Sequence, residues 1–139
     1  MAMKPEAKLY QLIKKNMTKA YLTRIESRVN LGIPDVLVAL PSTKKWTMLE
    51  LKIVSRGYAI NLSPHQYAFH LKHAELGCPS FIIVQYHPKG ATKTTEVELL
   101  LYEGRVARVL LEKGVRALPV ASYKLSDVDW DDLTEKLSQ

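Results

Sequence analysis

"GIPDVLVALPSTKKWTMLELKI", residues 32–53, contains two apolar segments separated by a polar stretch. Residues 35–40 and 46–54 are rich in Val, Leu and Ile and predict two strands, and residues 41–45, "PSTKK", predict the turn that joins them. Such a turn favours antiparallel pairing. Asp35, Glu50 and Lys52 interrupt these apolar strands, and their presence there needs an explanation.

Glu50 and Lys52 are two residues apart in a predicted strand, so their side chains share one face, while Leu49, Leu51 and Ile53 share the other. If Asp35 starts the neighbouring antiparallel strand, its carboxylate meets that of Glu50. Two such anions repel unless a cation lies between them. Mg²⁺ prefers carboxylate, carbonyl and water oxygens, so the expected ligands are Asp35, Glu50 and the Leu51 carbonyl, with Lys52 beside the reacting phosphate.

The chain before this stretch predicts one helix and one strand. Residues 4–17 carry apolar side chains near helical spacing, with Pro5 and Glu6 in the first turn. Residues 20–29 alternate with a period of two and predict a strand with one polar face. Together with the two strands above, they predict an antiparallel meander preceded by a helix.

The chain after this stretch changes period. Residues 62–77 predict a helix that stops at Gly77, with Ser63 as N-cap, Pro64 in the first position and a capping box between Ser63 and Gln66. Residues 80–86, "SFIIVQY", predict a strand buried on both faces that lies beside the Glu50 strand after a helical crossover.

The last third of the chain is predicted as a hairpin and a helix. Residues 96–112 suggest a hairpin turning at Glu103 and Gly104, although the second arm also fits helical spacing. Residues 126–137 predict a helix capped by Ser126 or Asp127. The fold class expected for residues 1–139 is therefore α/β, in one domain with a mixed central sheet flanked by helices.

The composition of the chain bears on its partners and its cellular location. The chain has 139 residues with 20 Lys and Arg against 14 Asp and Glu, a net charge of +6 that suits a polyanionic partner. Its single cysteine, Cys78, has no partner for a disulfide and is expected to be a buried small residue, and no apolar run suffices to span a membrane. We expect a soluble cytoplasmic protein without membrane contact.

The sequence resembles the PD-(D/E)XK nuclease superfamily, specifically its VRR-NUC and Holliday-junction-resolvase-like branches. Gly32-Ile33-Pro34-Asp35 followed by Glu50-Leu51-Lys52 carries the resemblance, with the order of predicted elements around it. The resemblance implies a restriction-endonuclease-like αβββαβ core and a magnesium-dependent DNA endonuclease, with Mn²⁺ as a substitute metal, that leaves a 5′-phosphate. Small members are similar to phage-encoded resolvases that cut branched or junction DNA as homodimers, and the hairpin at residues 97–111 is the expected interface.

Further roles follow from the resemblance or stay open. In the resemblance, the acid of the first helix corresponds to Glu6, which would complete the metal site, and Glu26 is the alternative acid. A glutamine after the lysine-bearing strand corresponds to Gln66, although the capping box also explains that residue. No zinc is assigned to the histidines of residues 65–73, because they lack a matching ligand set. The expected phosphate contacts are the basic residues flanking the motif, Arg24, Arg28, Lys44, Lys45, Arg56 and Lys72.

The alternative to an enzyme is a nucleic-acid-binding or structural protein that retains a nuclease-like scaffold without cleaving. An unrelated α/β protein with a chance Pro-Asp and Glu-Leu-Lys is the second alternative. The catalytic hypothesis differs from both alternatives in requiring that the carboxylates of Asp35 and Glu50 approach each other.

Overall fold

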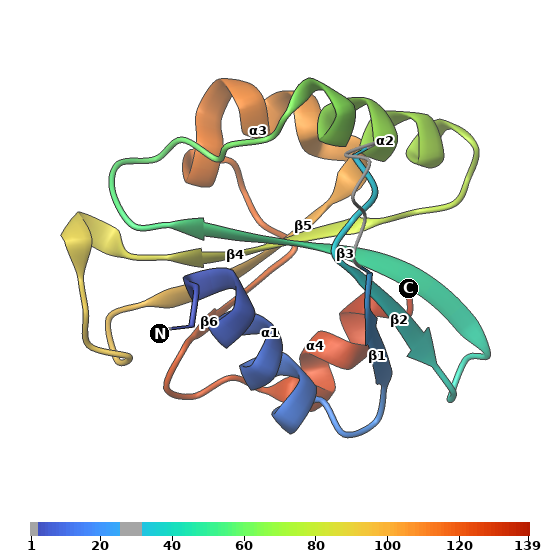
Figure 1. Ribbon diagram of the computed structural model, residues 1–139, viewed down its shortest axis with the longest axis horizontal. Coiled ribbons are helices and arrows are strands. Elements are labelled where there is room, and N and C mark those ends of the chain that lie inside the picture. Colours follow the sequence, from blue (N-terminus) through green and yellow to red (C-terminus); the bar gives the residue numbers. More distant parts are fainter. Residues whose placement is uncertain (1–2, 26–31) are drawn as a thin grey trace.

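A computed structural model describes residues 3–25 and 32–139, and shows one open sheet with helices on both faces (Figure 1). The elements in chain order are α1 (Pro5–Asn16), β1 (Tyr21–Arg24), β2 (Val36–Leu40), β3 (Lys45–Val54), α2 (Pro64–Glu75), β4 (Phe81–Tyr86), the 3₁₀ turn η1 (Pro88–Gly90), β5 (Glu98–Glu103), the 3₁₀ turn η2 (Gly104–Val106), α3 (Ala107–Lys113), the 3₁₀ turn η3 (Gly114–Arg116), β6 (Ala121–Lys124) and α4 (Trp130–Leu137).

The six strands follow one another across the sheet in sequence order. All neighbours are antiparallel except β3 and β4, which are parallel and are joined through α2. A parallel pair needs a crossover, and α2 supplies it on one face of the sheet. β3 is the longest strand and pairs with β2 along its first half and with β4 along its second half.

Two hydrophobic cores lie on opposite faces of the sheet. Helices α1 and α4 cover one face, and α2 and α3 cover the other (Figure 1). Leu49 and Leu51 of β3 belong to the core beneath α1 and α4, whereas Val54 belongs to the core beneath α2 and α3. Because strand side chains alternate, Glu50 and Lys52 share the α2 face with Val54.

The predictions for the first two thirds of the chain are confirmed where the structure describes them. The first helix, the antiparallel meander of β1 to β3, the crossover helix and the buried β4 all lie where the sequence placed them. Ser63 caps α2 with its side chain accepting from the Gln66 backbone N–H, and the reciprocal half of the capping box is present. Glu26 and Arg28, named from the sequence, lie outside the described residues.

The predicted hairpin of residues 97–111 is wrong. Glu103 ends β5, and the chain then turns through η2 into α3, so the helical alternative for the second arm is correct. The strand that pairs with β5 on its outer side is β6, which the sequence analysis missed. Packing explains the outcome, since Ala107 and Leu110 of α3 are buried in the core beneath α2 and α3.

The predicted cap of the last helix is also wrong. α4 begins at Trp130, and the Asp129 side chain accepts a hydrogen bond from the backbone N–H of Asp132 at 3.0 Å, so Asp129 is the cap rather than Ser126 or Asp127. Among helices in the described part of the chain, none combines the length and apolar character needed to cross a bilayer.

Candidate active site

Asp35 lies immediately before β2, opposite the middle of β3. The last ladder pair between the strands is Val36 with Leu49, so Asp35 stands beside Glu50 in the next register position. One carboxylate oxygen of Asp35, Oδ2, accepts a hydrogen bond from the Leu51 backbone N–H at 2.9 Å. This bond continues the β2–β3 pairing through a side chain and fixes the Asp35 carboxylate against β3.

Glu50 is only 1% exposed, and its carboxyl group contacts that of Asp35. Burial, followed by the hydrogen bond with Asp35 and the charge of Asp35, raises the pKa of Glu50 to about 9, against a smaller lowering effect of Lys52. Without a cation, Glu50 is therefore protonated at neutral pH.

Lys52 and Gln66 complete a connected set of side chains with Glu50. Lys52 Nζ donates to Gln66 Oε1 at 2.9 Å, and Gln66 Nε2 donates to Glu50 Oε2 at 3.3 Å. Gln66 Oε1 also accepts from the Ser63 backbone N–H at 3.0 Å as part of the capping box. Gln66 thus has both roles that the sequence allowed, since it caps α2 and contacts the two functional groups of β3.

Gly32 brings the loop before Asp35 against the start of α2. It has a φ of +76°, and a Cβ at this position would lie 2.2 Å from the backbone oxygen of His65 and 2.7 Å from the backbone nitrogen of Gln66. Only glycine combines this backbone conformation with such a close approach. The first residue of the Gly-Ile-Pro-Asp motif therefore sets the distance between Asp35 and Gln66.

His70 is the neighbour of Glu50 that the sequence analysis did not assign to the site. It is fully buried on α2, its Nδ1 lies 2.6 Å from Ser80 Oγ, and its Nε2 lies 3.9 Å from Glu50 Oε1. Burial is the main cause that lowers the pKa of His70 to about 4, so the ring is neutral at pH 7. The spacing of four residues from Gln66 on one helix face was the signal that could have identified it.

The additional carboxylate predicted for the metal site, that of Glu6, lies farther from Glu50 than that of Asp35 does. Glu6 is exposed in the first turn of α1, and its charge contributes least to the raised pKa of Glu50. Within residues 3–25 and 32–139, no group of three or more His, Cys, Asp or Glu side chains is gathered tightly enough to hold a metal ion. The structure thus brings together Asp35 and Glu50, with the Leu51 backbone beside them, and leaves Glu6 at longer range.

The predicted phosphate contacts divide between the two ends of the sheet. Arg56 follows the end of β3 and belongs to the end that carries Asp35 and Lys52. Arg24 pairs in register with Val36 at the same end, but its guanidinium lies 5.4 Å from the centroid of the Tyr10 ring on the α1 face, opposite the face of Lys52. Lys45 begins β3 five residues before Glu50, roughly 17 Å away at the rise of a strand. Lys44 precedes it in the turn, and Lys72 lies in the last turn of α2, so these two also lie away from Gln66 and Asp35.

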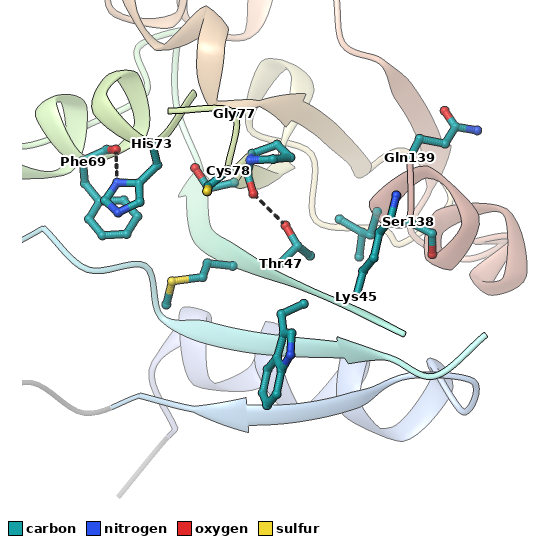
Figure 2. A pocket seen from close by; sticks show the side chains of 13 residues that line it. Lys45, Thr47, Phe69, His73, Gly77, Cys78, Ser138 and Gln139 are labelled. Atoms are coloured by element: carbon teal, nitrogen blue, oxygen red, sulfur yellow. Dashed lines mark hydrogen bonds between the residues drawn. The ribbon is translucent and has the colours of Figure 1, made fainter. Parts of the chain in front are cut away.

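A cavity of about 440 Å³ lies at that distant end, beside the first half of β3 (Figure 2). Lys45, Thr47, Phe69 and His73 help to line it, and none of Asp35, Glu50, Lys52 and Gln66 does. Cys78 also lines the cavity and is exposed, so the prediction of a buried cysteine is wrong. This cavity and the polar cluster are thus separate features along the same strand and helix.

The cluster around Glu50 fits a divalent cation by its donor set. Asp35 and Glu50 place two carboxyl groups in contact, and Glu50 Oε1 is buried with no hydrogen-bond partner. A cation between the carboxylates would take the place of the Glu50 proton and bind to hard oxygen donors. A scan against protein-family models and a search of curated proteins find no match to this chain, so this geometry is the basis for its interpretation.

Proposed function

We propose that the protein is a magnesium-dependent DNA endonuclease of the PD-(D/E)XK type. The observation that carries the proposal is the convergence of Asp35, Glu50, Lys52 and Gln66, from three segments of the chain, into one set of contacts. A solvated ion pair on a strand would not need a buried glutamate against a second carboxylate. Buried acids with strongly raised pKa values cluster at functional sites.

The order of elements supports the same proposal. Helix α1, the meander β1–β2–β3, the crossover helix α2 and the parallel strand β4 reproduce the αβββαβ order that the resemblance implies. In that arrangement the acid-lysine pair lies at the middle of the sheet and faces the start of α2. The likeness in order adds to the site geometry, because fold alone does not establish function.

Asp35, Glu50 and the Leu51 carbonyl are the groups that would hold Mg²⁺ or Mn²⁺, with Glu6 as the proposed additional carboxylate. When bound, the ion would supply Lewis-acid stabilisation of the phosphate and a water of lowered pKa. Asp35 is oriented for this role by the Leu51 N–H, and Glu50 by Gln66. Lys52, held by Gln66 Oε1, presents an ammonium group beside the two carboxylates, where it would stabilise charge on a non-bridging phosphate oxygen.

DNA is the proposed substrate, with branched or junction DNA as the preferred form. The net charge of +6 favours a polyanion, and Arg56 lies at the site's end of the sheet, where it would contact a flanking phosphate. A homodimer remains a prediction of the resemblance. The segment first expected to form its interface is β5 with α3 rather than a hairpin.

The test is cleavage of linear, flapped and four-way DNA in the presence of Mg²⁺, Mn²⁺ or a chelator. The wild type should cleave at least one substrate with either metal and none with chelator. Asp35→Asn, Glu50→Gln and Lys52→Ala should each lower the rate by at least about 100-fold, the usual scale for a group acting in the transition state.

Two exposed residues that make no contact in the proposed site provide matched controls. Lys113→Ala on α3 removes a lysine, and Asp131→Asn on α4 neutralises an acid; both should cleave like the wild type. Cleavage that persists after Lys52→Ala and Asp35→Asn would eliminate the site. Metal-independent DNA binding without cleavage would instead support the non-catalytic alternative.

A further inference from the structure

Two buried polar atoms face each other without hydrogen-bond partners beside the proposed metal site. Glu50 Oε1 and His70 Nε2 are 3.9 Å apart on side chains that are 1% and 0% exposed. Among the described residues, both atoms are buried and neither finds a partner. Buried polar atoms are rarely left unpaired, so the juxtaposition calls for a functional state in which they bond.

The other side of the imidazole is fixed. His70 Nδ1 lies 2.6 Å from Ser80 Oγ, and Ser80 is 2% exposed at the start of β4. The Ser80 hydroxyl can donate to Nδ1 or accept from it. In the tautomer in which Ser80 donates, the proton of the neutral ring lies on Nε2 and points toward Glu50 Oε1.

Gly104 packs against the His70–Ser80 pair. A Cβ on Gly104 would lie 2.7 Å from Ser80 Oγ and 2.8 Å from His70 Nδ1, and the Gly104 N–H donates to the Ser80 backbone oxygen at 2.7 Å. The turn after β5 thus packs against the His70–Ser80 hydrogen bond. The position of the imidazole is therefore determined by α2, β4 and this turn together.

We propose that His70 is a positioning residue, which holds the Glu50 carboxylate for metal binding by donating Nε2–H to Oε1. A carboxylate has about four lone-pair sites, so this bond and the one from Gln66 leave acceptor sites for the ion. Such outer partners orient a ligand and typically change metal affinity 10–100-fold when removed. The inference rests on the proposed metal-dependent function and adds a residue that neither the Asp35 nor the Glu50-Leu51-Lys52 motif contains.

The experiment measures Mn²⁺ affinity by titration calorimetry and by the electron paramagnetic resonance signal of free Mn²⁺. His70→Phe, which keeps a ring and removes both nitrogens, should weaken Mn²⁺ binding by about ten-fold or more. His70→Gln, whose amide N–H occupies the region of Nε2, should restore most of the affinity. His73→Phe is the matched control one turn along α2, because the His73 ring bonds the Phe69 backbone oxygen instead of facing Glu50, and it should bind Mn²⁺ like the wild type.

A second variant and a second measurement cover the case in which His70→Phe fails to fold. Ser80→Ala removes the partner of Nδ1 and should weaken Mn²⁺ binding in the same direction. In the Mg²⁺-loaded wild type, ¹⁵N signals of the ring should show the proton on Nε2.

Wild-type Mn²⁺ affinity in both His70→Phe and Ser80→Ala, or a ring proton on Nδ1 in the Mg²⁺-loaded protein, would overturn the role of His70 and leave the proposed nuclease intact. A wild type that binds no Mn²⁺ at all would remove the proposed function and the positioning role together.

Discussion

Lys52 Nζ and the Ser63 backbone N–H donate to the same atom, Gln66 Oε1, at 2.9 Å and 3.0 Å. One side-chain oxygen therefore links the lysine of the central strand to the N-terminal cap of the crossover helix. The nitrogen of the same amide, Gln66 Nε2, donates to the Glu50 carboxyl group. Helix α2 cannot shift along β3 without breaking the contacts of both proposed catalytic side chains.

This shared atom predicts that the cap and the site can be separated by two variants. Ser63→Ala removes the side-chain half of the capping box but keeps the Ser63 N–H, so it should lower the free energy of unfolding by about 1 kcal/mol and leave DNA cleavage close to wild type. Gln66→Ala should cost a similar amount of stability and also lower cleavage by at least about 10-fold, because Lys52 and Glu50 lose their partner. Denaturant unfolding and single-turnover cleavage provide the two measurements. Equal loss of cleavage in both variants would show that Gln66 acts only through the cap.

The raised pKa of Glu50 predicts a specific pH dependence of the metal-free protein. Glu50 has a folded-state pKa of about 9 against an ordinary value of 4.5, so folding binds a proton between these values and stability falls as pH rises through that range. Glu50→Gln mimics the protonated carboxyl. It should be more stable than the metal-free wild type at about pH 9 by more than about 1.4 kcal/mol, the equivalent of one pKa unit.

The measurement is chemical unfolding with chelator present between about pH 7 and about pH 9. Below about pH 7, the lowered pKa of His70 has the opposite effect on folding stability. The stability that His70 contributes is lost as pH falls from 6.5 through about 4. A wild type and a Glu50→Gln variant with parallel pH profiles would contradict the protonated carboxyl pair. Mg²⁺ should stabilise only the wild type, and more strongly at the upper end of the window, because binding displaces the proton.

Gly32→Ala should be more destabilising than its backbone conformation alone requires. Gly32 and Gly77 share a φ of +76°, but a Cβ on Gly32 would overlap the His65 backbone oxygen, whereas a Cβ on Gly77 would meet nothing within 4 Å. Gly77→Ala should therefore cost about 1 kcal/mol, for the left-handed conformation only, and Gly32→Ala more than about 2 kcal/mol. Thermal or denaturant unfolding of the two variants isolates the packing term. Equal costs would show that the loop does not press against α2.

Gly104→Ala should disturb His70 through steric overlap. The added methyl group would contact Ser80 Oγ and His70 Nδ1, and overpacking of this kind costs about 1–3 kcal/mol. In a Ser80→Ala background one of these overlaps is absent, so the same substitution should cost less. A double-mutant cycle on the free energy of unfolding measures this coupling, and additive costs would contradict close packing of the turn on the His70–Ser80 pair.

Local sequence determined the elements and much of the proposed site. The Val-, Leu- and Ile-rich runs at residues 35–40 and 46–54 defined β2 and β3, and the short turn between them favoured antiparallel pairing, which brings Asp35 beside Glu50. Ser63, Pro64 and Gln66 marked the start of α2 because caps depend on residues three positions apart. These features rest on contacts between residues near one another in the chain or directly across one turn.

Tertiary packing decided what local patterns left open. The second arm of residues 96–112 suits a strand or a helix by spacing. Burial of Ala107 and Leu110 against the α2 face selects the helix, while β6 takes the place beside β5. The environment of His70 likewise depends on Ser80 and Gly104, which are 10 and 34 residues away and reach it only when β4 and the turn after β5 pack on α2. Sequence alone identified the acids and the lysine, because strand alternation and turn chemistry are local, but the neutral imidazole beside Glu50 exists only through contacts made by distant segments across the sheet.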